Sequence, residues 1–434
     1  MAADVTAPAG SEAERWKYID RIRKVAGPYT DSDGISEESL EMFRDFKVLV
    51  IGAGGLGCEI LKNLAMSQFK NIHVIDMDTI DISNLNRQFL FRTDDVGKYK
   101  AEVAARFVER RVRGVSITPH AARIQDFDAD FYRQFQLVVC GLDSVEARRW
   151  INAMLVSIAE SADDADAIKP LVDGGTEGFR GQARVVVPTM TSCIECQLDM
   201  HAPRAAVPLC TIASVPRQPE HCVEWAHVIA WDREQPFADQ ALDKDDPVHV
   251  TWLYQKALAR AQEFGIPGVT YALTQGTIKN IIPAIASTNA IVAAACCNEA
   301  FKIATSTAPC LGLDNNYMMY SGNDSVYTYT FRHEKKPDCP VCGNDPRPLP
   351  VDPASTLQEL VDSLALRPEA QLKRPSIRGE GKTLYMQVPE ALERQTRPNL
   401  QKTIADLGLE NGQRLVVTDP AYPVEFHFFL KFTT

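Results

Sequence analysis

The order of hydrophobic and polar positions in the first half of the chain predicts alternating strands and helices. Short apolar runs of strand length are separated by longer segments whose apolar residues recur at helical spacing. This alternation is typical of βαβ units and indicates an α/β fold with an open, mostly parallel sheet. The expected strands are 47–51, 71–76, 115–119 and 136–140, and the expected helices lie near 55–67, 98–112 and 144–160.

The pattern changes outside this region. An amphipathic helix is expected at 12–26, and strands resume near 316–331 after a stretch that contains Trp225, Trp231 and Trp252. That stretch is irregular and dotted with proline, so we interpret it as an inserted domain. The expected divisions are 1–205 and 288–345 for the two parts of the strand–helix body, 206–287 for the insertion, 346–355 for a proline-rich linker, and 356–434 for a C-terminal domain.

The C-terminal domain has the pattern of a small α+β unit. The sequence LGLENGQRLVV around Leu407 has the helix, turn and strand order of a ubiquitin-like fold, although many small domains share it. The expected helices are 356–366 and 398–409, and the expected strands are 383–388, 413–419 and 426–433.

Composition and charge exclude several classes of partner. The formal charge of −11 disfavours nucleic acid and anionic membrane, since both require a basic face. The uncharged stretch 280–298 contains Pro283 and Asn289 and is too polar for a membrane span, so a buried helix is expected there. The first residues lack the features of a secretory signal, and eleven cysteines then indicate a reducing compartment, the cytoplasm and/or the nucleus.

Residues 48–57 read VLVIGAGGLG, an apolar strand that runs into a glycine-rich turn. Glycine lets the backbone turn tightly and approach a phosphate, and the following helix offers free amide hydrogens. The next strand ends in Asp76, at the distance along the chain where an acidic side chain meets a ribose hydroxyl. The sequence therefore predicts a Rossmann-like nucleotide site. The glycines are Gly52, Gly54, Gly55 and Gly57.

A polar run follows Asp76 and ends in a fixed cation, which suits a reactive polyphosphate better than a nicotinamide. Its members are Asp78, Asn84, Arg87 and Gln88. Lys100 opens the next helix and could reach a phosphate, although a surface lysine is the alternative. Asp143 follows the strand at 136–140 and is a candidate magnesium ligand, and it could also cap the next helix.

Two CxxC pairs indicate a metal site. Cys193 and Cys196 form one pair, Cys339 and Cys342 the other, and each lies in a turn-like context. Four thiolates form a tetrahedral cage for zinc and leave no open position, so the role would be structural. The alternative is two unrelated redox pairs.

Cys210 belongs to neither pair and begins the segment CTIASVPR. A reactive thiol needs access and a lowered pKa, which the sequence permits without proving. By residue type a lone cysteine is more often a buried hydrophobe, as we expect for Cys58, Cys140, Cys296 and Cys297. Cys222, beside His221, is the rival nucleophile.

These motifs, in this order, resemble the ubiquitin-like-modifier activating enzymes, and among them the catalytic subunits of the neddylation-activating type. The phrases NLNRQFLF, DGGTEGF and CTIASVPRQPEHC carry the resemblance, which covers the chain from about residue 40. The family is related to bacterial adenylyltransferases that activate sulfur-carrier proteins. The resemblance implies an adenylation domain, an inserted catalytic-cysteine domain and a ubiquitin-like domain that recruits the conjugating enzyme.

The resemblance also implies a mechanism. ATP with magnesium would adenylate the C-terminal glycine of a Nedd/Rub-type modifier, and Cys210 would then take the acyl group as a thioester. Asp76 would hold the ribose, Asn84, Arg87 and Lys100 would neutralise the leaving pyrophosphate, and Asp143 would position magnesium. Arg184 would lie in the strand facing the modifier's tail and repel an arginine-bearing tail, unless it is an ordinary strand arginine.

Relatives that act as single chains or homodimers supply an arginine from an N-terminal helix to a second adenylation fold. Here the corresponding helix carries Arg15, Arg21 and Arg23 without the usual spacing. The resemblance therefore implies a heterodimer with a distinct adenylation-fold regulatory subunit. Three hypotheses stay open: a modifier-activating enzyme or adenylyltransferase of another carrier, a nicotinamide oxidoreductase, and an inactive scaffold that tolerates Cys210→Ala.

Overall fold

The computed structural model describes residues 11–28, 30, 35–161, 164–200, 216–237, 242–244, 246–278, 284–343, 346–366, 372, 374–379, 381–420 and 422–433. The chain divides into two compact units, one formed by Met1–Met200 with Ile285–Thr434 and the other by His201–Ala284. The second unit overlaps the insertion expected at 206–287.

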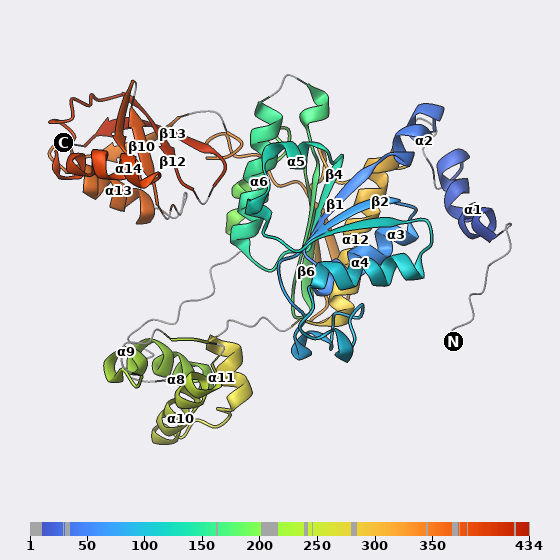
Figure 1. Cartoon of the computed structure of the whole chain (residues 1–434), viewed down its shortest axis with the longest axis horizontal. Helices are drawn as coiled ribbons and strands as arrows, with labels where there is room; N and C mark the ends of the chain where they lie inside the picture. The colour runs from blue at the N-terminus through green and yellow to red at the C-terminus, as the bar shows by residue number, and fades with distance from the viewer. Residues whose placement is uncertain are drawn as a thin grey trace. The chain divides into compact units, whose positions relative to one another are not determined.

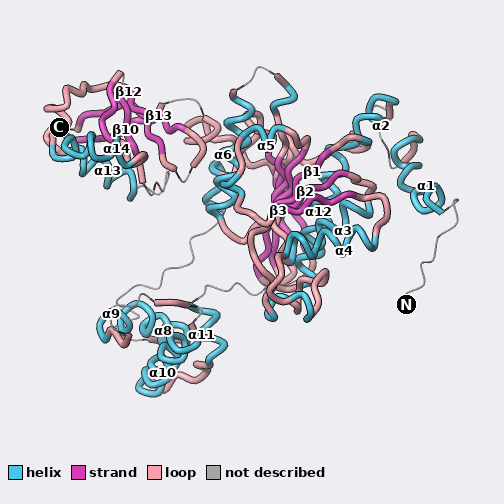
Figure 2. The backbone as a smooth tube through the Cα atoms, in the orientation of Figure 1, coloured by secondary structure: helices cyan, strands magenta, loops and turns pink. Residues whose placement is uncertain are grey.

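An eight-stranded sheet in the order β3-β2-β1-β4-β5-β6-β7-β8 forms the centre of the first unit (Figure 2). The strands from β3 to β5 run parallel in this order, and β6, β7 and β8 continue antiparallel. The expected mostly parallel sheet is confirmed. The strands are β1 (Lys47–Ile51), β2 (Asn71–Ile75), β3 (Ser116–His120), β4 (Leu137–Cys140), β5 (Leu171–Glu177), β6 (Arg180–Val186), β7 (Tyr317–Ser321) and β8 (Tyr327–Phe331).

Helices cover both faces of this sheet (Figure 1). Alternate residues of β1 enter two cores: Val48 and Val50 pack on one face, Leu49 and Ile51 on the other. Burial on both faces explains why β1 reads as a continuous apolar run. One face carries α3 (Gly55–Met66), α4 (Lys100–Arg111) and α12 (Ala286–Thr305), and the other α5 (Ala129–Arg133) and α6 (Val145–Glu160), while α1 (Ser11–Lys24) and α2 (Glu37–Arg44) precede β1.

The uncharged stretch 280–298 lies largely in α12, whose residues Val292, Ala293 and Cys296 are buried in the first core. The expected buried helix is thus confirmed for its described part, which excludes 279–283. Among the described residues, none of the helices combines the length and the apolar character needed to cross a membrane.

The described part of the second unit is helical. Its core contains Cys222, Trp231 and Leu253. A π-helical segment, Ala226–Ala230, joins two of its helices. The helices are α8 (Pro219–Trp225), α9 (Trp231–Glu234), α10 (Pro247–Glu263) and α11 (Tyr271–Ile278).

The C-terminal domain has a five-stranded sheet in the order β11-β10-β12-β13-β9, with Leu357, Leu360 and Leu364 of α13 (Leu357–Leu366) in its core. A helix packed on a mixed sheet confirms the expected ubiquitin-like fold. The remaining elements are β9 (Arg347–Val351), β10 (Ser376–Gly379), β11 (Lys382–Tyr385), α14 (Glu390–Thr396), β12 (Arg414–Thr418) and β13 (Glu425–Phe432).

The expected linker 346–355 is wrong in its first half. Residues 347–351 form β9, which pairs in parallel with β13 from Arg347 opposite Phe428 to Val351 opposite Phe432. Pro348 and Pro350 suggested a linker, but β9 lies at the edge of the sheet, where a missing N–H breaks no ladder bond when it faces outward.

The helix expected at 398–409 is also wrong. Only Arg397–Gln401 forms a 3-10 helix, and the regular helix, α14, lies upstream. Two backbone bonds hold the segment to the chain entering α13: Leu357 N–H donates to the Lys402 carbonyl and Ile404 N–H to the Ser355 carbonyl. These bonds replace helical ones, so tertiary pairing overrides the local helical pattern.

Candidate nucleotide site and four-cysteine cage

The glycine loop connects β1 to α3 in a turn that requires glycine. Gly52 has φ +97°, and a Cβ on it would lie 2.7 Å from the Gly141 carbonyl oxygen. A Cβ on Gly57 would lie 1.9 Å from the Gly52 carbonyl oxygen. Gly54 precedes α3 without a side-chain cap, so the amide hydrogens of the first helical turn stay available to an anion. This arrangement suits the phosphates of a nucleotide.

Asp76 lies directly after β2 and ties it to the glycine loop. Its carboxylate accepts hydrogen bonds from the backbone N–H of Ala53 at 2.7 Å and of Asp78 at 2.8 Å. Burial raises the pKa of Asp76, and the Ala53 hydrogen bond and the Lys100 charge oppose that rise. The carboxylate is therefore placed beside the loop, as the sequence predicted, and its contact with a ribose stays a prediction.

Lys100 and Asp78 form an ion pair beside the loop. The Lys100 Nζ lies 2.8 Å from an Asp78 carboxylate oxygen, and the Lys100 N–H donates to the Asp78 carbonyl at 2.9 Å. Lys100 is only 7% exposed. The alternative of an ordinary surface lysine is therefore wrong, because a buried ammonium held by one exposed carboxylate is poised to pair with another anion.

The polar run after Asp76 borders the same loop. Arg87 donates to the Ser83 carbonyl at 3.1 Å, and the Asn84 side chain accepts from the Asp81 N–H at 3.0 Å. Gln88 is buried, and its Oε1 has no hydrogen-bond partner in the described structure. A Cβ on Gly54 would lie 3.8 Å from the Gln88 Nε2. An orphaned amide oxygen beside a phosphate-type loop fits a site that is completed by a ligand.

Asp143 lies at the carboxyl end of β4, in the turn that touches the glycine loop through Gly141. Ser144 caps α6, since its Oγ accepts from the Ala147 N–H at 3.0 Å. The cap is thus Ser144, and Asp143 is left exposed with a carboxylate of the hard-oxygen type that Mg²⁺ prefers. Asp143 could therefore supply one oxygen ligand to a magnesium ion.

Arg184 lies in β6 with its side chain fully buried. Its guanidinium lies 2.9 Å from Asp173, and its Nη1 donates to Gln197 at 3.0 Å. The structure therefore shows Arg184 in a buried ion pair and not as a cation on an open surface. Its effect on a modifier's tail stays a prediction.

Cys210, the expected nucleophile, lies outside the described residues. The rival, Cys222, is buried in the core of the second unit. Burial raises its pKa, while Arg260 partly opposes the rise. A buried thiol with a raised pKa carries little thiolate at neutral pH, which disfavours Cys222 as a nucleophile. Cys58, Cys140, Cys296 and Cys297 are also buried, as expected.

The two CxxC pairs meet in one buried cluster. The Sγ atoms of all four cysteines lie within 4.8 Å of one another. Cys193 is 3.9 Å from Cys196 and 3.6 Å from Cys339, and Cys196 is 3.5 Å from Cys342. A tetrahedron with Zn–S bonds of about 2.3 Å has edges of about 3.8 Å, while a disulfide requires about 2.05 Å. The spacing fits zinc and excludes disulfides.

The cage is completed by its surroundings. Lys336 N–H donates to the Cys196 Sγ at 3.4 Å, an interaction that stabilises a thiolate. The hydrogen bond with Cys193 is the largest cause that lowers the pKa of Cys196 and brings the pKa of Cys339 to about 7. Burial raises the pKa of Cys193, and the pKa of Cys342 is also raised, because the lowering effect of Cys193 is outweighed by Cys196 and Cys339. The spacing of the four sulfurs, and not these opposed shifts, shows that the residues could hold zinc with a structural role.

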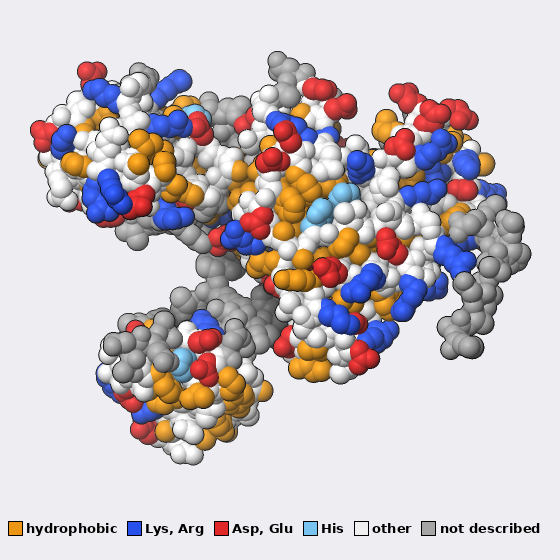
Figure 3. Space-filling model, viewed as in Figure 1, with side chains coloured by type: hydrophobic (Ala, Val, Ile, Leu, Met, Phe, Trp, Pro, Cys, Tyr) orange, Lys and Arg blue, Asp and Glu red, His pale blue; other side chains and the backbone are white. Residues whose placement is uncertain are grey.

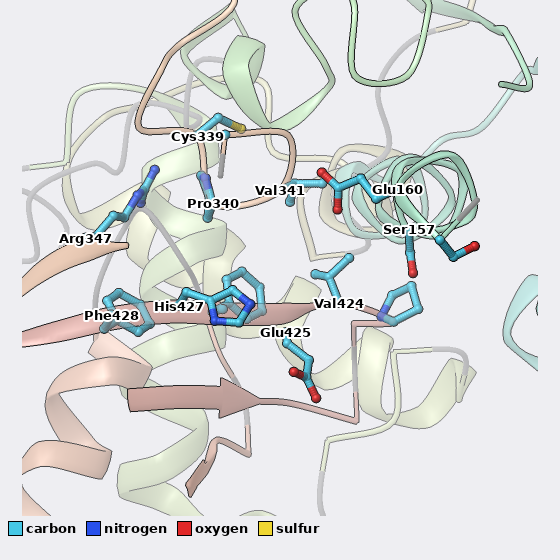
Figure 4. Close-up of a pocket in the computed structure, with 14 residues that line it drawn as sticks. Ser157, Glu160, Cys339, Pro340, Val341, Arg347, Val424, Glu425, His427 and Phe428 are labelled. Atoms are coloured by element: carbon cyan, nitrogen blue, oxygen red, sulfur yellow. The ribbon is translucent and has the colours of Figure 1, made fainter. Parts of the chain in front are cut away.

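A pocket of about 420 Å³ adjoins the cage (Figure 4). Ser157 and Glu160 of α6, Cys339 and Val341 of the cage loop, and His427 of β13 contribute to its lining. None of the residues predicted for the nucleotide lines it, so it is not the nucleotide site.

On the face shown in Figure 3, acidic and basic side chains are interspersed.

Three buried polar residues near the loop were missed by sequence reasoning: Arg148, Asp173 and Asn289. Arg148 and Asp173 form an ion pair at 2.9 Å, and Asn289 accepts from Thr176 at 2.7 Å. The signal for Asp173 was its place inside the strand PLVDGG, where a carboxylate is unusual. Asn289 gave no signal, because its neighbours Gly55 and Thr176 are distant in sequence.

The glycine loop, Asp76, Lys100 and Asp143 thus meet at the carboxyl ends of parallel strands, where α/β sheets bind their ligands. Together they define an α/β protein of the nucleotide-binding type.

Comparisons with known proteins agree. A model described as the ThiF family matches residues 30–341, and one described as an E2 binding domain matches residues 350–432. The NEDD8-activating enzyme E1 catalytic subunit of Dictyostelium discoideum is 52% identical over 422 residues, covering 94% of both chains. The Nedd8-activating enzyme E1 catalytic subunit of Drosophila melanogaster is 49% identical, covering 97% of this chain and 96% of the other.

Among solved structures, the crystal structure of E. coli MccB with succinimide has a TM-score of 0.44 and 22% identity, covering 70% of this chain and 68% of that chain, and adds nothing to the assignment. The chain belongs to the ThiF family and, within it, to the NEDD8-activating enzyme E1 catalytic subunits. It is an ATP-utilising adenylation enzyme.

Proposed function

We propose that this chain activates a Nedd/Rub-type ubiquitin-like modifier and passes it to a conjugating enzyme. The observation that supports this most is the convergence of the glycine loop, Asp76, Lys100 and Asp143 at one sheet edge, in a chain that shares about half its residues with enzymes named for NEDD8 activation. The match of residues 350–432 to an E2 binding domain supports the final transfer.

The first step is adenylation. A carboxylate is a poor acylating agent, so one oxygen of the modifier's C-terminal carboxylate attacks the α-phosphorus of ATP. The new O–P bond forms as the bond from that phosphorus to the bridging oxygen breaks, and pyrophosphate leaves with the electron pair. The amides of the α3 first turn approach the phosphates, while Asn84, Arg87 and Lys100 offset the charge on the leaving group.

Asp76 holds the ribose, and Gln88 provides an amide to the same pocket. Asp143 would supply an oxygen ligand to a magnesium ion, and the ion would supply positive charge that offsets the charge of the phosphate oxygens. Cys193, Cys196, Cys339 and Cys342 would hold zinc and would thereby close a large excursion of the chain between the two pairs. The role would be structural, since four thiolates leave no open position for catalysis.

The second step forms a thioester. The Cys210 thiolate attacks the acyl carbon, the C–S bond forms, and the C–O bond to AMP breaks so that AMP leaves with the electron pair. The thioester then reacts with a cysteine of the conjugating enzyme, which the C-terminal domain recruits. Cys210 is favoured over Cys222 because the latter is buried.

Arg184 remains the proposed selector of the modifier. Arg184 and Arg148 share the one carboxylate of Asp173, so this buried group keeps a net positive charge, and a charge in a low-dielectric interior acts over a longer range than in water. A cationic tail above β6 would therefore be disfavoured relative to a neutral one.

A distinct adenylation-fold subunit completes the enzyme as a heterodimer. This is supported by the arrangement of α1, whose Arg23 is held within the chain: it lies 4.2 Å from the Phe43 ring centroid and donates to Gln68 at 2.6 Å. Arg23 engaged in this way is not free to enter the site of a second copy, which disfavours a homodimer that exchanges this arginine; that a distinct subunit supplies the cation is part of the proposal.

ATP–pyrophosphate exchange tests the adenylation step. The chain, co-purified with its partner subunit, is incubated with labelled pyrophosphate, MgATP and a Nedd-type modifier, ubiquitin or a sulfur-carrier protein. We expect exchange with the Nedd-type modifier, unchanged in Cys210→Ala because adenylation precedes the thiol. Exchange with only the sulfur carrier would instead favour the adenylyltransferase hypothesis, and ATP binding without any exchange would favour the scaffold.

A further inference from the structure

A buried arginine on α6 reaches three places around the Asp143 turn. Arg148 is 6% exposed, and its Nε donates to both carboxylate oxygens of Asp173, at 2.9 and 3.2 Å. Its Nη2 donates to the carbonyl oxygens of Leu142 at 2.6 Å and of Gly174 at 2.9 Å. One planar guanidinium therefore joins α6, strand β5 and the turn after β4.

The Leu142 carbonyl belongs to the same planar peptide unit as the Asp143 N–H. Fixing that carbonyl fixes the plane from which the Asp143 side chain projects. Ser144 caps α6 just beyond, so the turn is held on both sides of Asp143. A metal ligand needs such support, because its affinity depends on the groups that orient it.

Asp173 extends the network to strand β6. The same carboxylate receives Arg184 at 2.9 Å, and Arg184 also bonds Gln197, the neighbour of Cys196. Burial raises the pKa of Asp173, but the charges of Arg148 and Arg184 together bring it below its ordinary value. The carboxylate is therefore ionised, and its two guanidinium contacts act as one unit.

We infer that Arg148 is a positioning residue for Asp143, and that the carboxylate of Asp173, shared with Arg184, couples the metal-binding turn to strand β6. The inference rests on the proposed function in that it takes Asp143 as the magnesium ligand. It extends that function because it assigns roles to two residues that are not among those proposed to contact ATP or the modifier.

Arg148→Lys is the sharpest test. A lysine ammonium can still pair with Asp173, but a single charged point cannot also serve the Leu142 and Gly174 carbonyls. Arg149→Lys is the matched control, since Arg149 is the next residue, is 3% exposed, and forms a buried pair with Glu195 at 2.6 Å. Both variants lose a buried guanidinium, and only one loses the contact with the turn.

The readout is metal binding and not turnover. Electron paramagnetic resonance counts free Mn²⁺ over the heterodimer saturated with α,β-methylene-ATP. We expect Arg148→Lys to weaken Mn²⁺ binding by about 10-fold or more, the typical cost of losing a group that orients a metal ligand. Arg149→Lys should stay within about 2-fold of the unsubstituted chain, and metal-free binding of the analogue should be unchanged in both.

Asp173→Asn keeps the test decisive if Arg148→Lys does not fold. This variant keeps the side-chain size and one acceptor but removes the charge that anchors both arginines, and it should weaken Mn²⁺ binding in the same direction. Unchanged Mn²⁺ binding in a folded Arg148→Lys, or in Asp173→Asn, would overturn the inference.

The proposed function fails separately. Suppose that the unsubstituted heterodimer fails to exchange pyrophosphate whichever modifier is added, yet Arg148→Lys weakens Mn²⁺ binding and Arg149→Lys does not. The positioning role then stands and the proposed function fails. If exchange occurs and both variants bind Mn²⁺ equally well, the function stands and the positioning role is wrong.

Discussion

Alanine substitutions at Gly55 and Gly57 of the loop should differ in how they respond to a second substitution, Asn289→Ala. Removing the Asn289 side chain should relieve the steric overlap at Gly55 and should not relieve the overlap at Gly57. A Cβ on Gly57 would lie 1.9 Å from the Gly52 carbonyl oxygen, which is backbone. A Cβ on Gly55 would lie 2.3 Å from the Asn289 Nδ2, which is the end of a side chain. Both positions lie in the first turn of α3, where the preference for alanine over glycine is at most the roughly 1 kcal/mol of a helix interior.

The magnitudes follow from which atom must move. At Gly57 the overlap can be relieved only by shifting the loop, at a cost of about 3 kcal/mol, which leaves a net destabilisation of about 2 kcal/mol. At Gly55, Asn289 can turn away by giving up its hydrogen bond with Thr176, which costs about 1 kcal/mol and roughly cancels the helical gain. Adding Asn289→Ala should therefore relieve Gly55→Ala and leave Gly57→Ala unrelieved.

Hydrogen exchange over residues 47–66 measures the local unfolding free energy, which is required because a chain of several units does not unfold in one step. Calorimetry with an ATP analogue supplies the second readout. We expect Gly57→Ala to lose protection and to bind the analogue at least about 10-fold more weakly, since a 2 kcal/mol loop shift exceeds a factor of ten. Protection equal to or above that of the unsubstituted chain in Gly57→Ala would refute the reasoning.

Three further outcomes are expected. Cys339→Ser should lose zinc in native mass spectrometry and Cys310→Ser, at an exposed cysteine, should keep it; retention of zinc by Cys339→Ser would show that the cage is not the metal site. Lys100→Met should slow pyrophosphate exchange by about 100-fold. Lys98→Met, which removes an exposed lysine paired with Asp95 at 2.9 Å, should leave the exchange rate within about 2-fold of that of the unsubstituted chain. Equal exchange rates in the two variants would exclude a role for Lys100. Burial, and then the charge of His120, lowers the pKa of His73 to about 4, below its value in the unfolded chain. Stability should therefore fall as the pH drops from about 6.5 to 4, because the unfolded state gains a proton that the native state does not bind. His73→Gln should recover about 1 kcal/mol of stability near pH 4 after allowance for solvent screening, and an unchanged pH profile of stability would contradict this.

The strand–helix body was predictable because each element carries its own local signal. The apolar run at β1, the glycine loop and the polar residues after β2 are contiguous in sequence, so periodicity and motif spacing place them without tertiary information. The cysteine cage was predictable for a different reason: few residue patterns other than paired CxxC motifs bring four thiols within 4.8 Å.

The errors arose where tertiary pairing decides the local structure. The prolines of β9 indicate a linker, and only the pairing with β13 makes this segment a strand. The segment 398–409 has a helical pattern, but hydrogen bonds to the start of α13 replace the helical ones. The prediction that Arg184 lies in the strand facing a modifier's tail stays a prediction, but the sequence did not indicate its buried partner Asp173 on the neighbouring strand. None of these pairings can be read from the residues on either side.

In the proposed function, the chain forms a thioester with a Nedd-type modifier on Cys210. The most direct measurement is a non-reducing gel of the heterodimer after incubation with MgATP and either a Nedd-type modifier or ubiquitin, with Cys210→Ala and Cys222→Ala in parallel. We expect a thiol-sensitive band with the Nedd-type modifier only, absent in Cys210→Ala and present in Cys222→Ala. A band that persists in Cys210→Ala, or no band with either modifier despite ATP binding, would contradict the proposed function.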